Sequence, residues 1–422
     1  MITTAALDKT YQELGTESQD IYRTLGLLPI ADIDPTMTAA VCQLSWGHAD
    51  WGLQILAEEQ VLEPVHNTVS YGRYQLVPTA RDHARALAVQ TDSEQDRQDV
   101  LRRLFKWLLA IATQARHRLT AVHVTLPHLA IGTVLASEAP FNDDAGALEW
   151  LQAVESSFLS VLSAAELAGW DDLIWQLVDA FAPLPLHRQP CEVLIAAQEL
   201  GLRAARRVGN EAVIRQTLIY GGMGLSSAGR AEDAIRWYKQ ALISARDQED
   251  TRAEGEALLG LGSCHHQAGH PDRAIPFLAE ASSVWQQSDY PQGVALATLV
   301  IGEIVLPDNP RRALDLFAWA RSELLRAGAP YDANRALALQ GHARVLTGDS
   351  DAGTEDLEEA LAGFTDVASS QWRARGLEFL GQALLSRGQH DTARACFTQA
   401  ADLYAKVSPL DFERVRAVWS GL

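Results

Sequence analysis

The densest group of metal-ligating side chains in the sequence is Cys264, His265 and His266, followed by His270. Thiolate and imidazole groups that converge on one point can bind zinc. Gly269, however, ends the expected helix between His266 and His270, and the repeat described below makes His265 a packing residue. We therefore expect no metal site here.

The sequence also lacks the common catalytic motifs. Gly222-Met223-Gly224 looks like part of a dinucleotide-binding fingerprint, but it lies within an expected helix and follows no strand. The sequence contains no G-x-S-x-G, H-E-x-x-H or C-x-x-C pattern. We expect a protein that is not an enzyme and that uses no cofactor.

The composition narrows the class of partner. The formal net charge of -19 disfavours the phosphate backbone of nucleic acids and an anionic membrane surface. No apolar run is long enough to span a bilayer, and the first residues carry no secretion signal. The four cysteines are far apart, which favours buried free thiols and a cytoplasmic location. They are Cys42, Cys191, Cys264 and Cys396.

Much of the sequence follows a repeat of about forty residues, and this repeat determines where the residues discussed above lie. Its marker glycines are separated by 40, 40, 39 and 40 residues and are Gly222, Gly262, Gly302, Gly341 and Gly381. Small residues recur at two later positions of each repeat, at Ala234, Ala274, Ala313, Gly353 and Ala393, and at Ala241, Ala281, Ala320, Ala360 and Ala400. A fixed period of this length is typical of repeat architectures, so the fold is expected to be mostly α, an α-solenoid.

Each repeat reads as two helices. Residues 253–268 have apolar side chains on one helical face, Gly269 and Pro271 then break the helix, and residues 272–287 form the second. The pattern resembles the tetratricopeptide repeat, for example in LGSCHHQAGHPDRAIPFLAEA (261–281). We expect the solenoid over residues 146–422, with degenerate repeats in 146–210, clear repeats in 211–408 and a capping helix in 411–422.

The first helix of each repeat is expected to line a groove that binds a peptide or protein. Counting from each glycine predicts exposed groove residues with an apolar centre, an acidic flank and a basic far end. Trp285 and Trp372 are further candidates for surface anchors. The candidate groove residues are Gln216, Ile219, Met223, Glu256, Leu259, His266, Leu299, Glu303, Arg335, His342, Arg375 and Glu378.

The first ninety residues differ from the repeats. They read as helices at 5–14, 18–25, 35–44 and 50–60, then strands at 61–65 and 74–77. This order predicts a winged-helix domain over residues 1–90, joined by a helical connector and loop over 91–145. Residues 1–90 contain only five lysines and arginines but eleven acidic residues, so we expect no direct binding of nucleic acid.

The amino-acid sequence of these ninety residues also resembles that of a known family. LDKTYQELGTESQDIYRTLGLLPIADID, WGLQILAEEQVLEP and SYGRYQLVPTARDHARALA are similar to the winged-helix segment of STAND regulators of the AfsR-like actinobacterial class. That family carries a nucleotide-binding module, but no glycine here is followed by lysine, so its phosphate-binding loop is absent. Val77-Pro78 also stands where the family has a His-Asp pair.

The resemblance implies the sensor and partner-binding part of a transcriptional regulator. The alternative is a stand-alone accessory protein that binds a substrate peptide, or assists an enzyme, in a secondary-metabolite pathway. Both predict a protein or peptide partner, and neither involves nucleic acid or a membrane. The sequence leaves the oligomeric state open and is compatible with an oligomer.

Overall fold

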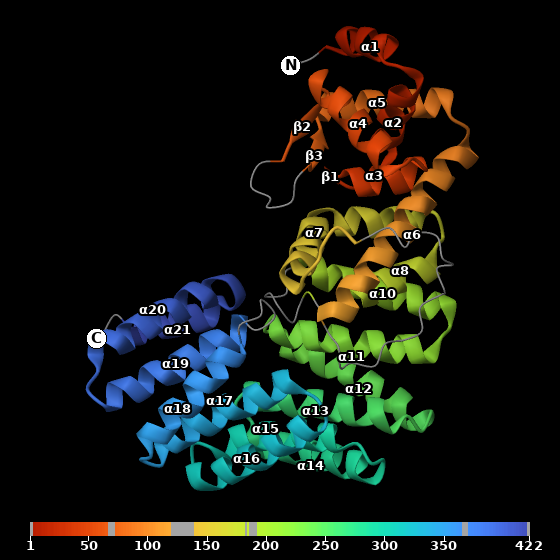
Figure 1. The fold of residues 1–422 in the computed structure, drawn as a ribbon. Helices are drawn as coiled ribbons and strands as arrows, with labels where there is room; N and C mark the ends of the chain where they lie inside the picture. The colour runs from red at the N-terminus through yellow and green to blue at the C-terminus, as the bar shows by residue number, and fades with distance from the viewer. Residues whose placement is uncertain are drawn as a thin grey trace. The chain divides into compact units, whose positions relative to one another are not determined.

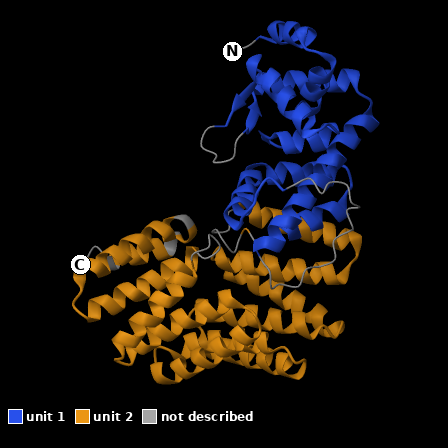
Figure 2. Cartoon of the chain, viewed as in Figure 1, with its two compact units in different colours: residues 1–181 blue, residues 182–422 orange. Residues whose placement is uncertain are grey.

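The computed structural model describes residues 3–65, 72–119, 139–181, 184, 192–364 and 370–419. The chain divides into two compact units, residues 1–181 (unit 1) and 182–422 (unit 2) (Figures 1 and 2). Helices dominate both units, which confirms the prediction of a mostly α protein. Of the cysteines, Cys42, Cys264 and Cys396 are free thiols, and Cys191 lies outside the described residues.

Unit 1 begins with five helices and a small antiparallel sheet. The strand order is β1-β3-β2, and Gln75 of the central strand faces both Asp32 and Glu63. The predicted helices and both predicted strands are present, whereas β1 was not predicted because a two-residue strand shows no alternation. The elements are α1 (Thr4–Glu13), α2 (Thr16–Leu27), β1 (Asp32–Ile33), α3 (Pro35–Cys42), α4 (Trp46–Glu58), β2 (Leu62–Pro64), β3 (Tyr74–Leu76) and α5 (Pro78–Thr91).

Three further helices complete the described part of unit 1: the long helices α6 (Glu94–Leu119) and α7 (Asp144–Leu167) and the short helix α8 (Asp171–Ala180). The rings of Trp107 on α6 and Trp150 on α7 meet edge to face, with centroids 5.9 Å apart. Arg116 on α6 forms an ion pair with Asp179 on α8, and both side chains are buried. The boundaries expected at residues 90 and 145, and the degenerate repeats in 146–210, stay predictions.

Unit 2 is a series of antiparallel helical pairs, as Figure 1 shows. Five pairs follow α10, and α21 packs against the last helix of the series. The solenoid-like arrangement of the predicted repeats is confirmed. The helices are α10 (Glu192–Val208), α11 (Glu211–Ser227), α12 (Ala231–Asp247), α13 (Thr251–Gln267), α14 (Pro271–Gln287), α15 (Pro291–Val305), α16 (Pro310–Arg326), α17 (Pro330–Leu346), α18 (Ser350–Gly363), α19 (Ser370–Ser386), α20 (His390–Val407) and α21 (Pro409–Trp419).

The marker glycines make room for one large side chain from the second helix of the same pair. A Cβ on Gly302 would come within 2.4 Å of the Phe317 ring, and one on Gly381 within 2.9 Å of the Phe397 ring. Leu278 occupies the same place beside Gly262. The glycine therefore accommodates a leucine or aromatic ring on the facing helix, in addition to the small residues expected there.

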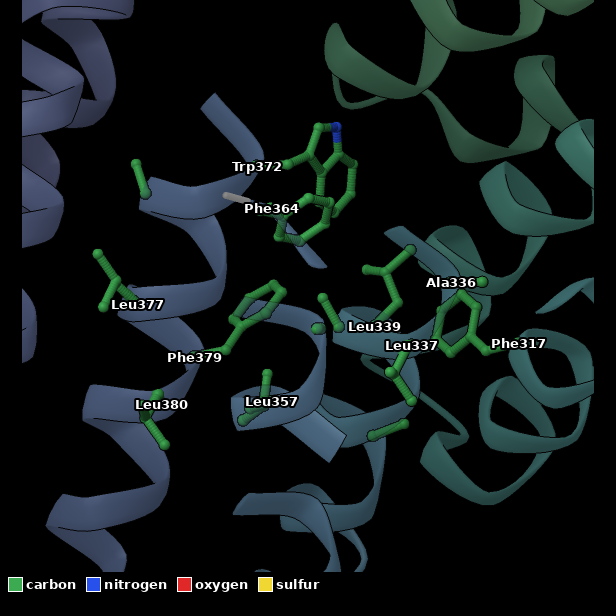
Figure 3. Packing of buried hydrophobic residues seen from close by; sticks show 14 of the residues in the cluster. Phe317, Ala336, Leu337, Leu339, Leu357, Phe364, Trp372, Leu377, Phe379 and Leu380 are labelled. Carbon is green, nitrogen blue, oxygen red and sulfur yellow. The ribbon is translucent and has the colours of Figure 1, made fainter. Parts of the chain in front are cut away.

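The core of unit 2 runs between the helices of each pair and on into the next pair. One continuous cluster extends from Ala295 to Val415, and Figure 3 shows part of it, including Phe317, Phe364 and Phe379. Trp285 is 1% exposed, so its suggested role as a surface anchor is wrong. Its indole is enclosed because the Gly255 and Gly293 backbones lie directly against it.

Candidate partner-binding surface

The first helices of successive pairs contact one another along unit 2: α11 with α13, α13 with α15, α15 with α17, and α17 with α19. We call the surface that these five helices present away from their second helices the inner wall. Nine of the twelve predicted groove residues are half-buried on these helices. They are Gln216, Met223, Glu256, Leu259, His266, Glu303, Arg335, His342 and Arg375.

The other three candidates are buried, so the prediction that they are exposed is wrong. Ile219 is 6% exposed, Leu299 1% and Glu378 5%. All three stand three residues before a marker glycine, whereas Leu259, at the same position before Gly262, is half-buried. The repeat phase alone therefore did not predict how closely neighbouring helices cover each position.

Glu378 has a structural contact of its own. Its carboxylate accepts a hydrogen bond from the Tyr404 hydroxyl on α20 at 3.2 Å. It also pairs with the Arg414 guanidinium on α21, at 2.9 Å for Nη2. These contacts join the last two helices to α19. They explain why Glu378 is buried, and no bound ligand is needed to explain it.

Four charged residues and one tryptophan on the inner wall form a group that we call the Glu303 cluster: Glu303, Asp332, Arg335, Trp372 and Arg375. Arg375 Nη2 on α19 lies 2.7 Å from Glu303 Oε1 on α15, so this ion pair links two first helices that are separated by α17 in the series. Arg335 Nη1 lies 2.7 Å from Asp332 Oδ1 on its own helix. The structure thus brings three predicted groove residues, Glu303, Arg335 and Arg375, into one group.

Aromatic rings support these arginines. The Cζ atoms of Arg335 and Arg375 each lie 4.8 Å from the centroid of the Trp372 ring, within the range of cation–π attraction. Arg375 also lies over Phe379, at 5.4 Å. The ring of His342 stacks on Phe379, with centroids 4.0 Å apart and planes 8° from parallel.

Burial and charge together set the protonation of the cluster. Burial, and then the charge of Arg375, lower the pKa of His342 to about 4, so this ring is neutral at pH 7. Burial also lowers the pKa of His266, and the charge of Glu303 opposes that effect. Burial favours the neutral form of Arg335, but interactions with Asp332, Tyr331 and Glu303 together outweigh it and raise its pKa. The Glu303 carboxylate therefore acts on groups from α13, α17 and α19.

A second polar group lies on α13. Arg252 pairs with Glu256 at 3.4 Å, donates to the Tyr290 hydroxyl at 3.1 Å, and lies over the Tyr290 ring at 4.4 Å. Burial is the main cause that raises the pKa of Glu256, while Arg252 opposes it. The acidic flank expected at Glu256 is therefore balanced by an adjacent cation.

Sequence reasoning missed the parts of the site that depend on neighbouring helices. Trp372 was proposed as a surface anchor, yet it is 9% exposed and lies beneath two arginines. Asp332, Phe379 and Tyr290 were not named. The only signal for Asp332 was its i,i+3 spacing to Arg335, which is typical of paired charges on a helix.

The remaining chemistry of the described residues is sparse. No group of three or more metal-ligating His, Cys, Asp or Glu side chains occurs among them. His265 stacks on Phe277, whereas His266 faces the charge of Glu303. A depression of about 410 Å³ on α11 and α12 contains no inner-wall candidate. No helix in the described ranges has the length and apolarity needed to cross a membrane.

Comparison with known sequences gives two results. Models of the tetratricopeptide repeat match residues 217–287 and 374–406, which confirms the predicted repeat type. The Regulatory protein AfsR of Streptomyces coelicolor is 24% identical over 98% of this chain and 46% of its own length. The chain is similar to AfsR. It spans about half the length of that curated relative, and the predicted resemblance to AfsR-like regulators is confirmed.

Solved structures show distant likeness. A STAND protein with a tetratricopeptide repeat sensor from Pyrococcus horikoshii matches 99% of this chain and 67% of its own, with 15% identity and a TM-score of 0.43. A Rap protein solved in complex with competence and sporulation factor matches 81% of this chain and 89% of its own, with 13% identity and a TM-score of 0.49.

Proposed function

We propose that this chain is a non-catalytic regulatory protein of the cytoplasm whose inner wall binds a peptide or a protein segment. The observation that carries the proposal is the Glu303 cluster, where predicted groove residues from separate repeats meet on one surface. The similarity of 98% of the chain to a regulatory protein supports the regulatory role.

The inner wall has the composition of a recognition surface. It combines half-buried apolar side chains such as Met223 and Leu259 with charged groups held by neighbours. A peptide bound there would bury apolar area against the wall, and its polar groups would meet the charged groups at Glu256 and Glu303. Such a surface supports binding and offers no arrangement of nucleophile and base.

The winged-helix assignment of residues 1–90 belongs to the same proposal. The order of helices and strands and the β1-β3-β2 sheet support it. On α4, Trp46 is 58% exposed and Trp51 57%, and the helix has no lysine or arginine. Exposed tryptophans suit a protein contact, so we expect duplex DNA not to be retarded by the chain even at low salt. Retardation that weakens steeply with salt would contradict this expectation.

Alanine substitutions on the inner wall test the proposal. The full chain is immobilised, and proteins retained from an extract of its source cells are quantified by mass spectrometry. Four single changes on the wall are expected to reduce one common retained partner. They are Met223→Ala, His266→Ala, Glu303→Ala and Arg335→Ala.

Matched changes on exposed positions of the second helices serve as controls and should leave retention unchanged. They are Lys239→Ala, Gln287→Ala and Glu358→Ala. If retention survives all four wall changes, or falls equally with the controls, the inner wall is not the binding surface.

The second candidate is an accessory protein that holds a substrate peptide for an enzyme. The same wall would serve it, so binding alone does not distinguish the two. It predicts that the retained partner includes an enzyme whose rate on the peptide rises when this chain is added. A regulatory chain would instead change transcription when it is deleted, without altering any such rate.

A further inference from the structure

One carboxylate on the inner wall pairs with an arginine two helical pairs further along and lies near charged groups of other repeats. Glu303 on α15 pairs with Arg375 on α19 at 2.7 Å, and its charge also acts on Arg335 of α17 and His266 of α13. In a solenoid, each repeat contacts mainly its immediate neighbours. An ion pair between α15 and α19 is therefore an unusual contact, because it links two first helices that are not neighbours in the series.

The charges of this group are already balanced. Arg335 is paired with Asp332, and Arg375 with Glu303. A further carboxylate added to the group would bring one uncompensated negative charge. A carboxylate that takes the place of Glu303 would leave the balance unchanged, so the favourable reaction is exchange and not addition.

The residues around Arg375 have unused hydrogen-bonding capacity. Arg335 Nε and His342 Nδ1 are buried and have no hydrogen-bond partner. Arg335 Nε is a donor, and leaving a buried donor unpaired costs about 1–3 kcal/mol, so a ligand that supplies an acceptor there gains that energy. Trp372 fixes both guanidiniums from one side, which limits the entropy lost when they bind a new group.

We propose that Glu303 is an internal substitute for an acidic side chain of the bound peptide. When the peptide enters, its Asp or Glu carboxylate takes the place of Glu303 at Arg375 and accepts from Arg335 Nε. Glu303 turns toward solvent, and the bridge between α15 and α19 is released. The ligand is thus a peptide with an acidic residue, and the inference rests on the proposed function.

Peptide pools provide the probe. Short synthetic peptides are randomised except at one central position, which is Glu in one pool and Gln in the other, and both ends are capped. A third pool has Gln at that position and a free carboxyl terminus. Retention of each pool on the immobilised full chain is measured by mass spectrometry.

The wild type should prefer the Glu pool over the Gln pool roughly tenfold, the ratio expected from one charge-assisted hydrogen bond. Glu303→Gln removes the competing charge and should increase that preference. Arg375→Gln should abolish it. Arg375→Lys keeps a cation and should retain part of it, and thermal unfolding of each variant checks folding. The control Glu358→Gln, on the exposed face of α18, should change nothing.

The outcomes separate the two proposals. Equal retention of the Glu and Gln pools overturns the exchange at Glu303 but leaves peptide binding intact. If the Arg375→Gln variant still prefers the Glu pool, the exchange at Glu303 is overturned as well. Preference for the free-terminus pool would assign the carboxylate to the chain end and overturn the side-chain assignment. If no pool is retained by any variant, peptide binding on the inner wall fails, and the exchange fails with it.

Discussion

At the scale of single residues, the marker glycines and His342 on the inner wall have different structural roles. The glycines give space to a large side chain of the facing helix, as Gly302 does for Phe317. His342 instead fills a half-buried place in an aromatic stack, next to a cation that disfavours its protonation. Both roles can be tested by single substitutions.

Gly302→Ala should destabilise unit 2. The new Cβ would lie 2.4 Å from the Phe317 ring, so the ring and the helix must shift, and overpacking of this kind costs about 1–3 kcal/mol. Gly224→Ala is the matched control, because nothing lies within 4 Å of its Cβ and the helix gains up to about 1 kcal/mol. Urea unfolding measures both. Equal effects would show that the glycine period does not reflect packing.

The stability of the folded chain should depend on the ionisation of His342. The unfolded chain takes up this proton below about pH 6.5, whereas the folded chain does so only near pH 4, the value to which burial and Arg375 lower the pKa. The stability present above pH 6.5 is therefore lost progressively as the pH falls toward 4. Between pH 7 and pH 5 the loss should be roughly 1–2 kcal/mol.

His342→Phe keeps a ring against Phe379 and removes the titrating group. Its free energy of unfolding, measured in urea at both pH values, should fall by correspondingly less than that of the wild type. The same pH dependence in both proteins would contradict the assignment to His342.

At the scale of elements, sequence reasoning was strongest where a pattern recurs. The period predicted the helical pairs, and α13 and α14 end within two residues of the expected ranges. The burial of Leu299 and Glu378 could not be predicted, because it depends on neighbouring helices, which for Glu378 are α20 and α21. The pairing of Arg375 with Glu303 also depends on the distance from α15 to α19, which no local pattern contains.

The last helix, α21, is attached through Glu378, and Arg414→Gln should loosen it. The substitution leaves the buried carboxylate with the Tyr404 hydroxyl but without its cation, a loss of about 1–3 kcal/mol. Hydrogen exchange of α21 should accelerate. Arg416→Gln is the control, since its pair with Glu413 is exposed and worth little. Unchanged exchange in Arg414→Gln would show that apolar contacts alone hold α21.

At the scale of the whole molecule, the chain combines two compact units with different tasks in our account. Unit 1 contains the small sheet and the exposed tryptophans of α4, and unit 2 contains the inner wall. The similarity to AfsR covers nearly the whole chain and so includes both units. Our proposed function requires that a partner bind on the inner wall.

Site-specific photo-crosslinking tests this central claim most directly. Benzoylphenylalanine is placed at Met223 on the inner wall or, as the control, at Ile243 on α12, which is 63% exposed. After irradiation in the source cells, our account predicts a defined partner crosslinked from Met223 and none from Ile243. A partner crosslinked from Ile243 alone, or equally from both, would contradict the assignment of the inner wall as the binding surface.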